Sequence, residues 1–132
     1  MTEIRLVQPI GFSLDVFALG KHDLDFLANA IVTEGIHTLL EVGCGISSLL
    51  LSQLCHVTTL ENDPKWADKV SAAKRDIHDL DVILWDGKGW PVKGRWDAVG
   101  FQKILQARDR RSAGIRAPAQ GLFLKRVRYD LP

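Results

Sequence analysis

A strand, a glycine turn and a helix start follow one another directly, and this succession most constrains what the chain can fold into. The strand is Ile36–Val42, whose length and apolar composition are typical of a strand buried on both faces of a sheet. Gly43 and Gly45 come next, and glycine permits a sharp turn. Ser47 or Ser48 can then cap a short leucine-rich helix. The segment therefore predicts one unit of a parallel α/β sheet.

The rest of the pattern predicts further alternation of helices and strands. Asp63 is a suitable N-cap for a helix that begins at Pro64, with Trp66 on its inner face. Helices are also expected at residues 22–33 and 104–113, and strands at 57–60, 82–85, 96–101 and 122–129, the last as a sheet edge. Right-handed crossovers then give a doubly wound, mainly parallel sheet of about five strands in three layers, α/β/α.

Length and composition indicate one soluble domain. The 132 residues are 46% hydrophobic and 25% charged, and no apolar run approaches the ~20 residues of a membrane span. The first residues lack the basic-then-apolar order of a secretory signal, so we expect a cytoplasmic protein with reduced Cys44 and Cys55. The single domain would comprise an irregular lead-in (1–21), a core (22–101) and a short basic segment (102–132).

Acidic residues near the ends of the predicted strands suggest the chemistry of a site. Glu61 follows the second strand and Asp86 follows the third, and parallel strands open their carboxyl ends on one edge of the sheet. A carboxylate at Glu61 can accept both hydroxyl protons of a ribose, and Asp86 can accept from the amine of an adenine. Glu41, before the glycine turn, would repel a pyrophosphate but attract an ammonium group. This pattern predicts a pocket for a nucleoside-bearing cofactor.

The same residues resemble the class I S-adenosylmethionine-dependent methyltransferases over residues 23–101. The similarity lies in the Glu41–Ser47 stretch, in Glu61 with Asn62, and in Asp86-Gly87. It implies a Rossmann-like fold, S-adenosylmethionine as the cofactor and methyl transfer to an unknown acceptor. The cofactor-binding residues that the resemblance implies are Glu41, Gly43, Cys44, Gly45, Ser47, Glu61, Asn62, Asp86 and Gly87.

No catalytic residue and no metal site can be assigned from the sequence. Asp97 stands at the start of the fourth strand, away from the predicted pocket, and the histidines show no ligand spacing. Only 31 residues follow Phe101, which makes the methyltransferase core look truncated on its C-terminal side. Two hypotheses stay open: a methyltransferase, or a non-catalytic Rossmann-like cofactor-binding or assembly module. An exposed sheet edge would favour a homodimer in either case.

Charge is distributed unevenly along the chain. Residues 1–102 carry 9 Lys+Arg against 14 Asp+Glu, whereas residues 103–132 carry 8 against 2. This asymmetry fits a solvated basic face that balances an acidic body, and it also fits a nucleic-acid partner. An RNA role predicts an affinity that falls steeply with salt and that is lost when Arg108, Arg110 and Arg111 are neutralised.

Overall fold

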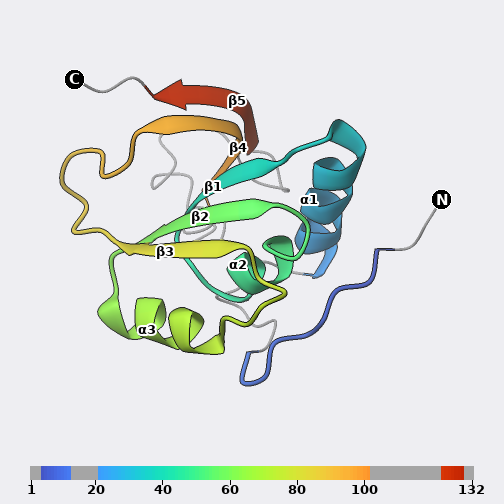
Figure 1. Ribbon diagram of the computed structural model, residues 1–132, viewed down its shortest axis with the longest axis horizontal. Coiled ribbons are helices and arrows are strands. Elements are labelled where there is room, and N and C mark those ends of the chain that lie inside the picture. The colour runs from blue at the N-terminus through green and yellow to red at the C-terminus, as the bar shows by residue number, and fades with distance from the viewer. Residues whose placement is uncertain (1–3, 13–20, 102–122, 130–132) are drawn as a thin grey trace.

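The computed structural model describes residues 4–12, 21–101 and 123–129. The helix expected at 104–113 therefore lies outside the described residues. Helices and strands alternate along the described chain (Figure 1). In order they are α1 Lys21–Glu34, β1 Thr38–Val42, α2 Ile46–Leu51, β2 His56–Glu61, α3 Pro64–Ala73, β3 Leu80–Leu84, β4 Gly94–Phe101 and β5 Phe123–Tyr129.

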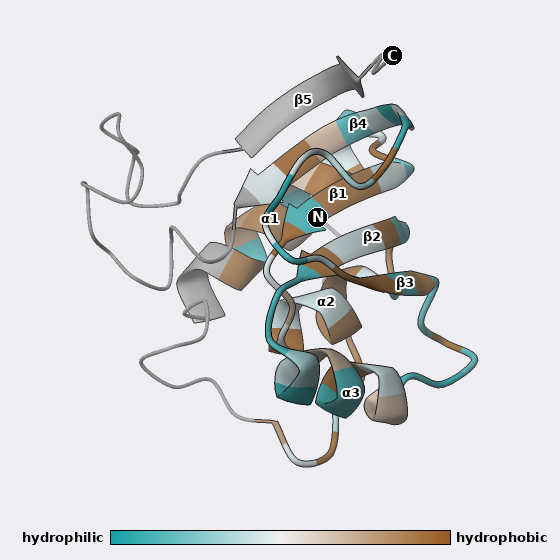
Figure 2. Ribbon diagram, turned by 90° about the vertical axis from the view of Figure 1, so that its left-hand side faces the viewer, coloured by the Kyte–Doolittle hydropathy of each residue, from teal (hydrophilic) through white to brown (hydrophobic). Residues whose placement is uncertain are grey.

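The strands form a single sheet in the order β3-β2-β1-β4-β5 (Figure 1). Strands β1 to β4 run parallel, which confirms the predicted α/β class. Strand β5 is antiparallel to β4 and lies at the outer edge, with Arg128 opposite Arg95 and Leu124 opposite Val99. The central strands β1 and β4 carry much of the hydrophobic sequence, whereas α3 presents many hydrophilic residues (Figure 2).

All three described helices contribute to one core cluster, on one face of the sheet. Alternate strand residues such as Leu39 and Val57 belong to this cluster, together with Ile31 of α1, Leu49 of α2 and Val70 of α3. Among the described residues of the opposite face, a second cluster joins strand residues to the β3–β4 loop and contains no helical residue. Its members are Leu40, Leu60, Trp96 and Val99, flanked by Ile83, Trp85, Trp90 and Val92.

The expected second layer of helices is thus not found in the described part of the chain, and the connections explain why. The steps from β1 to β2 and from β2 to β3 go in the same direction across the sheet, so right-handed crossovers place α2 and α3 on the same face. The step from β3 back to β4 reverses direction and belongs on the other face. Residues 85–93 make this step as a loop without a helix.

Residues 4–12 contain no helix or strand and are held against the helical face of the sheet. Ile4, Leu6 and Phe12 pack against the core. The side chain of Gln53 accepts from the N–H of Val7 (2.8 Å) and donates to its carbonyl oxygen (2.9 Å). The amide side chain of Gln53 therefore bonds both backbone groups of Val7, as a neighbouring strand would.

Helix α3 begins as predicted and buries Val70 as expected, but it leaves one expected inner residue, Trp66, exposed. Asp63 accepts from the N–H of Lys65 at 3.0 Å, and Pro64 occupies the first turn. Trp66 was expected on the inner face but is 43% exposed. The buried stripe passes through Ala67 and Val70, which leaves Trp66 at its margin. No described helix is long and apolar enough to span a membrane.

Candidate functional site

The predicted site residues lie at the carboxyl edge of the parallel strands. Val42 stands opposite Leu60 in the β1–β2 ladder, and Glu61 stands opposite Leu84 in the β2–β3 ladder. The turns that follow these strands therefore open side by side. This arrangement brings Glu41, Glu61 and Asp86 to the same edge of the sheet. Whether they contact a ligand there stays a prediction.

The glycine turn needs glycine at one of its two positions. Gly43 has a φ of 99°, a left-handed backbone conformation that residues other than glycine rarely adopt. Its N–H donates to the carbonyl of Leu60 at 2.7 Å, so the turn stays bonded to β2. Gly45 has a φ of 169°, which is extended backbone open to any residue. Its N–H donates to the Ser48 hydroxyl at 3.1 Å, so Ser48 caps α2 from within the first turn.

Glu41 is directed into the protein. It is 3% exposed and accepts from the hydroxyl of Ser47 at 2.6 Å and from the hydroxyl of Ser48. Burial raises the pKa of Glu41 from 4.5 to about 7, against the lowering effect of hydrogen bonds from Ser47, Ser48 and Thr59; the charge of Glu61 adds a smaller rise. The carboxyl group thus ties β1 to the start of α2.

Glu61 is buried in the same way and joins two turns. It is 2% exposed. One carboxylate oxygen accepts from the N–H of Cys44 at 3.0 Å, and the other accepts from the N–H of Asp63 at 2.9 Å. Backbone donors of the β1–α2 turn and of the α3 N-terminus therefore engage both oxygens. Cys44 itself is buried.

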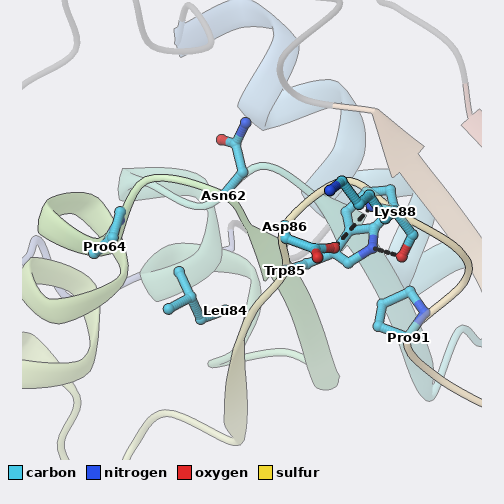
Figure 3. A pocket seen from close by; sticks show the side chains of 7 residues that line it. All are labelled: Asn62, Pro64, Leu84, Trp85, Asp86, Lys88 and Pro91. Carbon is cyan, nitrogen blue, oxygen red and sulfur yellow. Dashed lines mark hydrogen bonds between the residues drawn. The ribbon is translucent and has the colours of Figure 1, made fainter.

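An open pocket of about 470 Å³ lies beside these turns (Figure 3). Its volume falls in the range of about 300–1,000 Å³ typical of small-ligand sites. Pro64 and Leu84 lie on one side of it, and Trp85, Lys88 and Pro91 lie on the other. Asn62 and Asp86 complete the lining.

The far side of the pocket is fixed by the loop that follows β3. The indole N–H of Trp85 donates to the carbonyls of Lys88 (3.2 Å) and Gly89 (3.1 Å). Asp86 accepts from the N–H of Lys88 at 2.8 Å. The ring of Trp90 stands edge-on to Trp85, with centroids 6.0 Å apart and planes at 77°. These contacts hold the Trp85 ring in place without a ligand.

The structure divides the nine predicted site residues into two groups. Asn62 and Asp86 line the pocket, and Gly87, with a φ of 85°, makes the turn behind Asp86. The other six are buried and lie in the β1–α2 turn or in the strands and helix beside it, namely Glu41, Gly43, Cys44, Gly45, Ser47 and Glu61. Sequence reasoning missed the pocket residue Lys88; the spacing of Gly87 and Gly89, both with positive φ, is the signal that predicts such a returning loop.

A second surface of interest is the outer edge formed by β4 and β5. Strand β5 contains Lys125, Arg126 and Arg128, and its partner β4 carries the exposed Arg95 as its second residue. The opposite edge of the sheet is acidic: Asp79 and Asp81, at the start of β3, contact the two ring nitrogens of His56 at 2.7 and 3.3 Å. Within the described residues no group of three His, Cys, Asp or Glu side chains is arranged to hold a metal.

Comparisons with known proteins find short similarities to RNA-modifying enzymes. The chain is 35% identical over 60 residues to tRNA pseudouridine synthase A of Afipia carboxidovorans, which covers 46% of this chain and 24% of that protein. The enzyme of the same name from Bradyrhizobium diazoefficiens is 33% identical over 60 residues, with the same coverage. That of Brucella ovis is 49% identical over 39 residues, covering 30% of this chain and 16% of the relative.

The chain thus spans about a quarter or less of the length of these curated relatives. No family model matches it. No solved structure matches it either.

These similarities correct the expectation of an S-adenosylmethionine-dependent methyltransferase. The relatives are named for pseudouridine synthesis in tRNA, so methyl transfer and the S-adenosylmethionine cofactor are both withdrawn. The alternative, a non-catalytic cofactor-binding module, gains no support from them. The structure supplies a physical reason for the error: Glu41 and Glu61, whose positions suggested a cofactor, satisfy donors of their own turn. A strand, a glycine turn and an acidic residue can stabilise the fold without binding a cofactor.

Proposed function

We propose that this chain acts in tRNA modification by binding tRNA. The partial similarity to tRNA pseudouridine synthase A carries the proposal. The proposal concerns binding, because the chain spans too little of these relatives for their chemistry to be assigned to it.

The charge distribution supports an RNA partner independently of the comparisons. Residues 103–132 carry six of the nine arginines and have 8 Lys+Arg against 2 Asp+Glu. RNA carries one negative charge per phosphate, and basic residues that neutralise phosphates release bound counterions. Arginine also presents planar donors that match phosphate oxygens. A locally basic segment on an otherwise acidic chain is therefore suited to RNA.

The pocket at the carboxyl edge is proposed to receive an unpaired nucleotide of the bound tRNA. Trp85 offers a fixed aromatic ring, and unpaired bases stack on such rings. Asn62 and Asp86 line the same space with an amide and a carboxylate, which can pair with the edge of a base. Lys88 adds a cation suited to a neighbouring phosphate. The predicted residues Asn62, Asp86 and Gly87 thus keep a proposed binding role, toward RNA.

Equilibrium binding of the whole chain to an unmodified tRNA transcript tests the proposal. We expect saturable binding. The logarithm of the association constant should fall linearly with the logarithm of the salt concentration, with a slope of about −0.7 to −0.9 for each phosphate contacted. A duplex DNA of similar length serves as the competitor. Absence of saturable binding at low salt, or an affinity that does not change with salt, would remove this function.

Replacing Trp85 tests the role of the pocket. Base stacking contributes about 1–3 kcal/mol per base, so Trp85→Leu should weaken tRNA binding by at least about fivefold. Trp66→Leu is the matched control, because Trp66 is 43% exposed on α3 and does not line the pocket. Equal affinities for the two variants, both with cooperative thermal unfolding, would exclude the pocket as the nucleotide site.

A further inference from the structure

Asp86 differs from the other acidic residues at the carboxyl edge of the sheet. Glu61 is 2% exposed, and its two carboxylate oxygens accept from the N–H groups of Cys44 and Asp63. Glu41 is 3% exposed and accepts from two serine hydroxyls of α2. Asp86, by contrast, is exposed and lines the pocket. Among the described residues that line this pocket no other is acidic, so a carboxylate contact with a ligand there falls to Asp86.

The loop after β3 fixes the carboxyl group of Asp86 but leaves it able to accept further hydrogen bonds. Its Oδ1 accepts from the N–H of Lys88 at 2.8 Å, which sets the orientation of the group. Its Oδ2 has no hydrogen-bond or ion-pair partner within the described part of the chain. A carboxylate has about four lone-pair sites on its two oxygens, so both oxygens can accept from a ligand. Asp86 therefore presents an oriented group that only accepts.

Trp85 precedes Asp86 in the chain and offers only its ring to a ligand. Its indole N–H already donates to the carbonyls of Lys88 (3.2 Å) and Gly89 (3.1 Å). The edge-on contact with Trp90 also holds the ring in place. Both Trp85 and Asp86 line the pocket, where they lie close together (Figure 3). A base stacked on this ring can therefore bring its edge to the carboxylate.

An acceptor-only carboxylate distinguishes the four bases by the donors that they present. On its Watson–Crick edge guanine carries two adjacent donors, N1–H and the N2 amino group, which match the two carboxylate oxygens. Adenine and cytosine present one amino group beside a ring nitrogen that accepts, and uracil presents one N–H between two carbonyl oxygens. Each of these three bases would place an acceptor against the carboxylate. A site built for two hydrogen bonds discriminates strongly against a ligand that supplies one.

We infer that the pocket selects an unpaired guanine of the bound RNA and that Asp86 determines this specificity. The guanine stacks on Trp85, and its N1–H and N2 amino group donate to the Asp86 carboxylate. Such hydrogen bonds to a charged acceptor are stronger than those between neutral groups. Lys88, which suits a neighbouring phosphate, adds affinity without selecting a base. This inference rests on the proposed tRNA binding and names the nucleotide that the pocket receives.

Short uridine-rich oligoribonucleotides that differ only in their central base test this inference with the whole chain. We expect a central guanine to bind at least about tenfold more tightly than adenine, cytosine or uracil. Inosine keeps N1–H but lacks the 2-amino group, so it should bind about tenfold more weakly than guanine. This arm uses the wild type and does not depend on the folding of a variant.

Replacing the carboxylate should abolish the preference for guanine. In Asp86→Asn an amide substitutes a donor for one acceptor, whereas its oxygen can still accept from the N–H of Lys88 and keep the loop. The measured quantity is the ratio of guanine to uracil affinities, because the loss of a negative charge raises the affinity for all RNA equally. Asp76→Asn is the matched control: Asp76 is exposed in the connection before β3 and does not line the pocket, so this variant should keep the wild-type ratio.

The outcomes separate this inference from the function on which it rests. If the wild type binds tRNA but does not distinguish the four central bases, the inference fails and tRNA binding stands. A guanine preference that survives in Asp86→Asn, or equal binding of inosine and guanine, would also overturn it. If the wild type does not bind tRNA, the proposed function itself fails.

Guanosine monophosphate distinguishes a free nucleotide from a nucleotide within RNA. It should displace the guanine-containing oligonucleotide only at a concentration at least about tenfold higher than that of the oligonucleotide itself, because it lacks the neighbouring contacts of a polymer. Displacement at equal concentration would assign the pocket to free guanine nucleotides and overturn the inference.

Discussion

At the scale of the residue, Glu41 is a carboxyl group whose environment favours its neutral form. It is buried at the end of β1 with two serine hydroxyls as partners. The position of this glutamate before a glycine turn can be read from the sequence. Its inward direction cannot, because that depends on how α2 brings Ser47 and Ser48 over the strand. The sequence therefore located the turn but did not reveal the serine and backbone partners of its acids.

Titration of Glu41 should make the stability of the protein depend on pH. Its pKa is about 7 in the folded chain and 4.5 for an exposed glutamate, so the folded state keeps a proton that the unfolded state releases. This contribution is complete below pH 4.5 and is lost as the pH rises through 7. Between pH 4.5 and 7, Glu41 should lower the free energy of unfolding of the wild type by about 3 kcal/mol. The Glu41→Gln variant should not show this decline.

Urea unfolding of both proteins across the window measures this difference. Burial and the nearby Arg75 lower the pKa of His78, so this residue changes the free energy of unfolding with pH in the opposite direction. Both proteins contain His78, so the comparison between them isolates Glu41. Glu34→Gln, at the exposed end of α1, is the control and should follow the wild type. A Glu41→Gln variant with the wild-type decline would contradict the assignment.

Gly43 is the other residue whose replacement gives a sharp test. At a φ of 99° an alanine should cost about 1–2 kcal/mol, because its Cβ crowds the backbone. Gly100→Ala is a suitable comparison, since a Cβ there meets nothing within 4 Å and the φ is ordinary. Chemical denaturation of the two variants gives both values. Similar stability of the two would mean that the turn does not depend on glycine at position 43.

At the scale of the element, the clamp between Gln53 and the N-terminal segment makes a local prediction. Gln53 donates to and accepts from the backbone of Val7, and each such bond contributes about 0.5–1.5 kcal/mol. Gln53→Leu should therefore destabilise the protein by about 1–2 kcal/mol and expose residues 4–12 to protease. Limited proteolysis with mass spectrometry detects the change. Gln8→Leu, an exposed neighbour on the same segment, should cleave like the wild type.

Local signals predicted the elements better than their assembly. Asp63 and Pro64 fix the start of α3, and the parallel order follows from strands separated by helices. The basic strand near the C-terminus was expected at an edge, and β5 lies there. The second helical layer was inferred from the pattern of alternation, but the β3–β4 connection is a loop in the described chain. Trp66 was misplaced because its helix buries only a narrow stripe.

At the scale of the whole molecule, the similarity to known proteins was the least predictable property. The strand, turn and acid pattern from Glu41 to Asp86 satisfies a general requirement of parallel sheets, so it does not distinguish a cofactor site from a well-bonded turn. The similarity to tRNA pseudouridine synthase A supplied information that these residues do not contain. The expected homodimer stays a prediction, and light scattering of the free chain tests it.

The two outer strands differ in sign: Asp79 and Asp81 flank His56 at one end of the sheet, and Arg95 faces Arg128 at the other. We expect the opposite charges of these strands to give the described sheet an electric dipole across its width. In the field of a polyanion it should rotate before contact, so that its arginine-bearing side leads. Added salt should then slow the capture of RNA much more than it hastens release, which stopped-flow measurements can resolve.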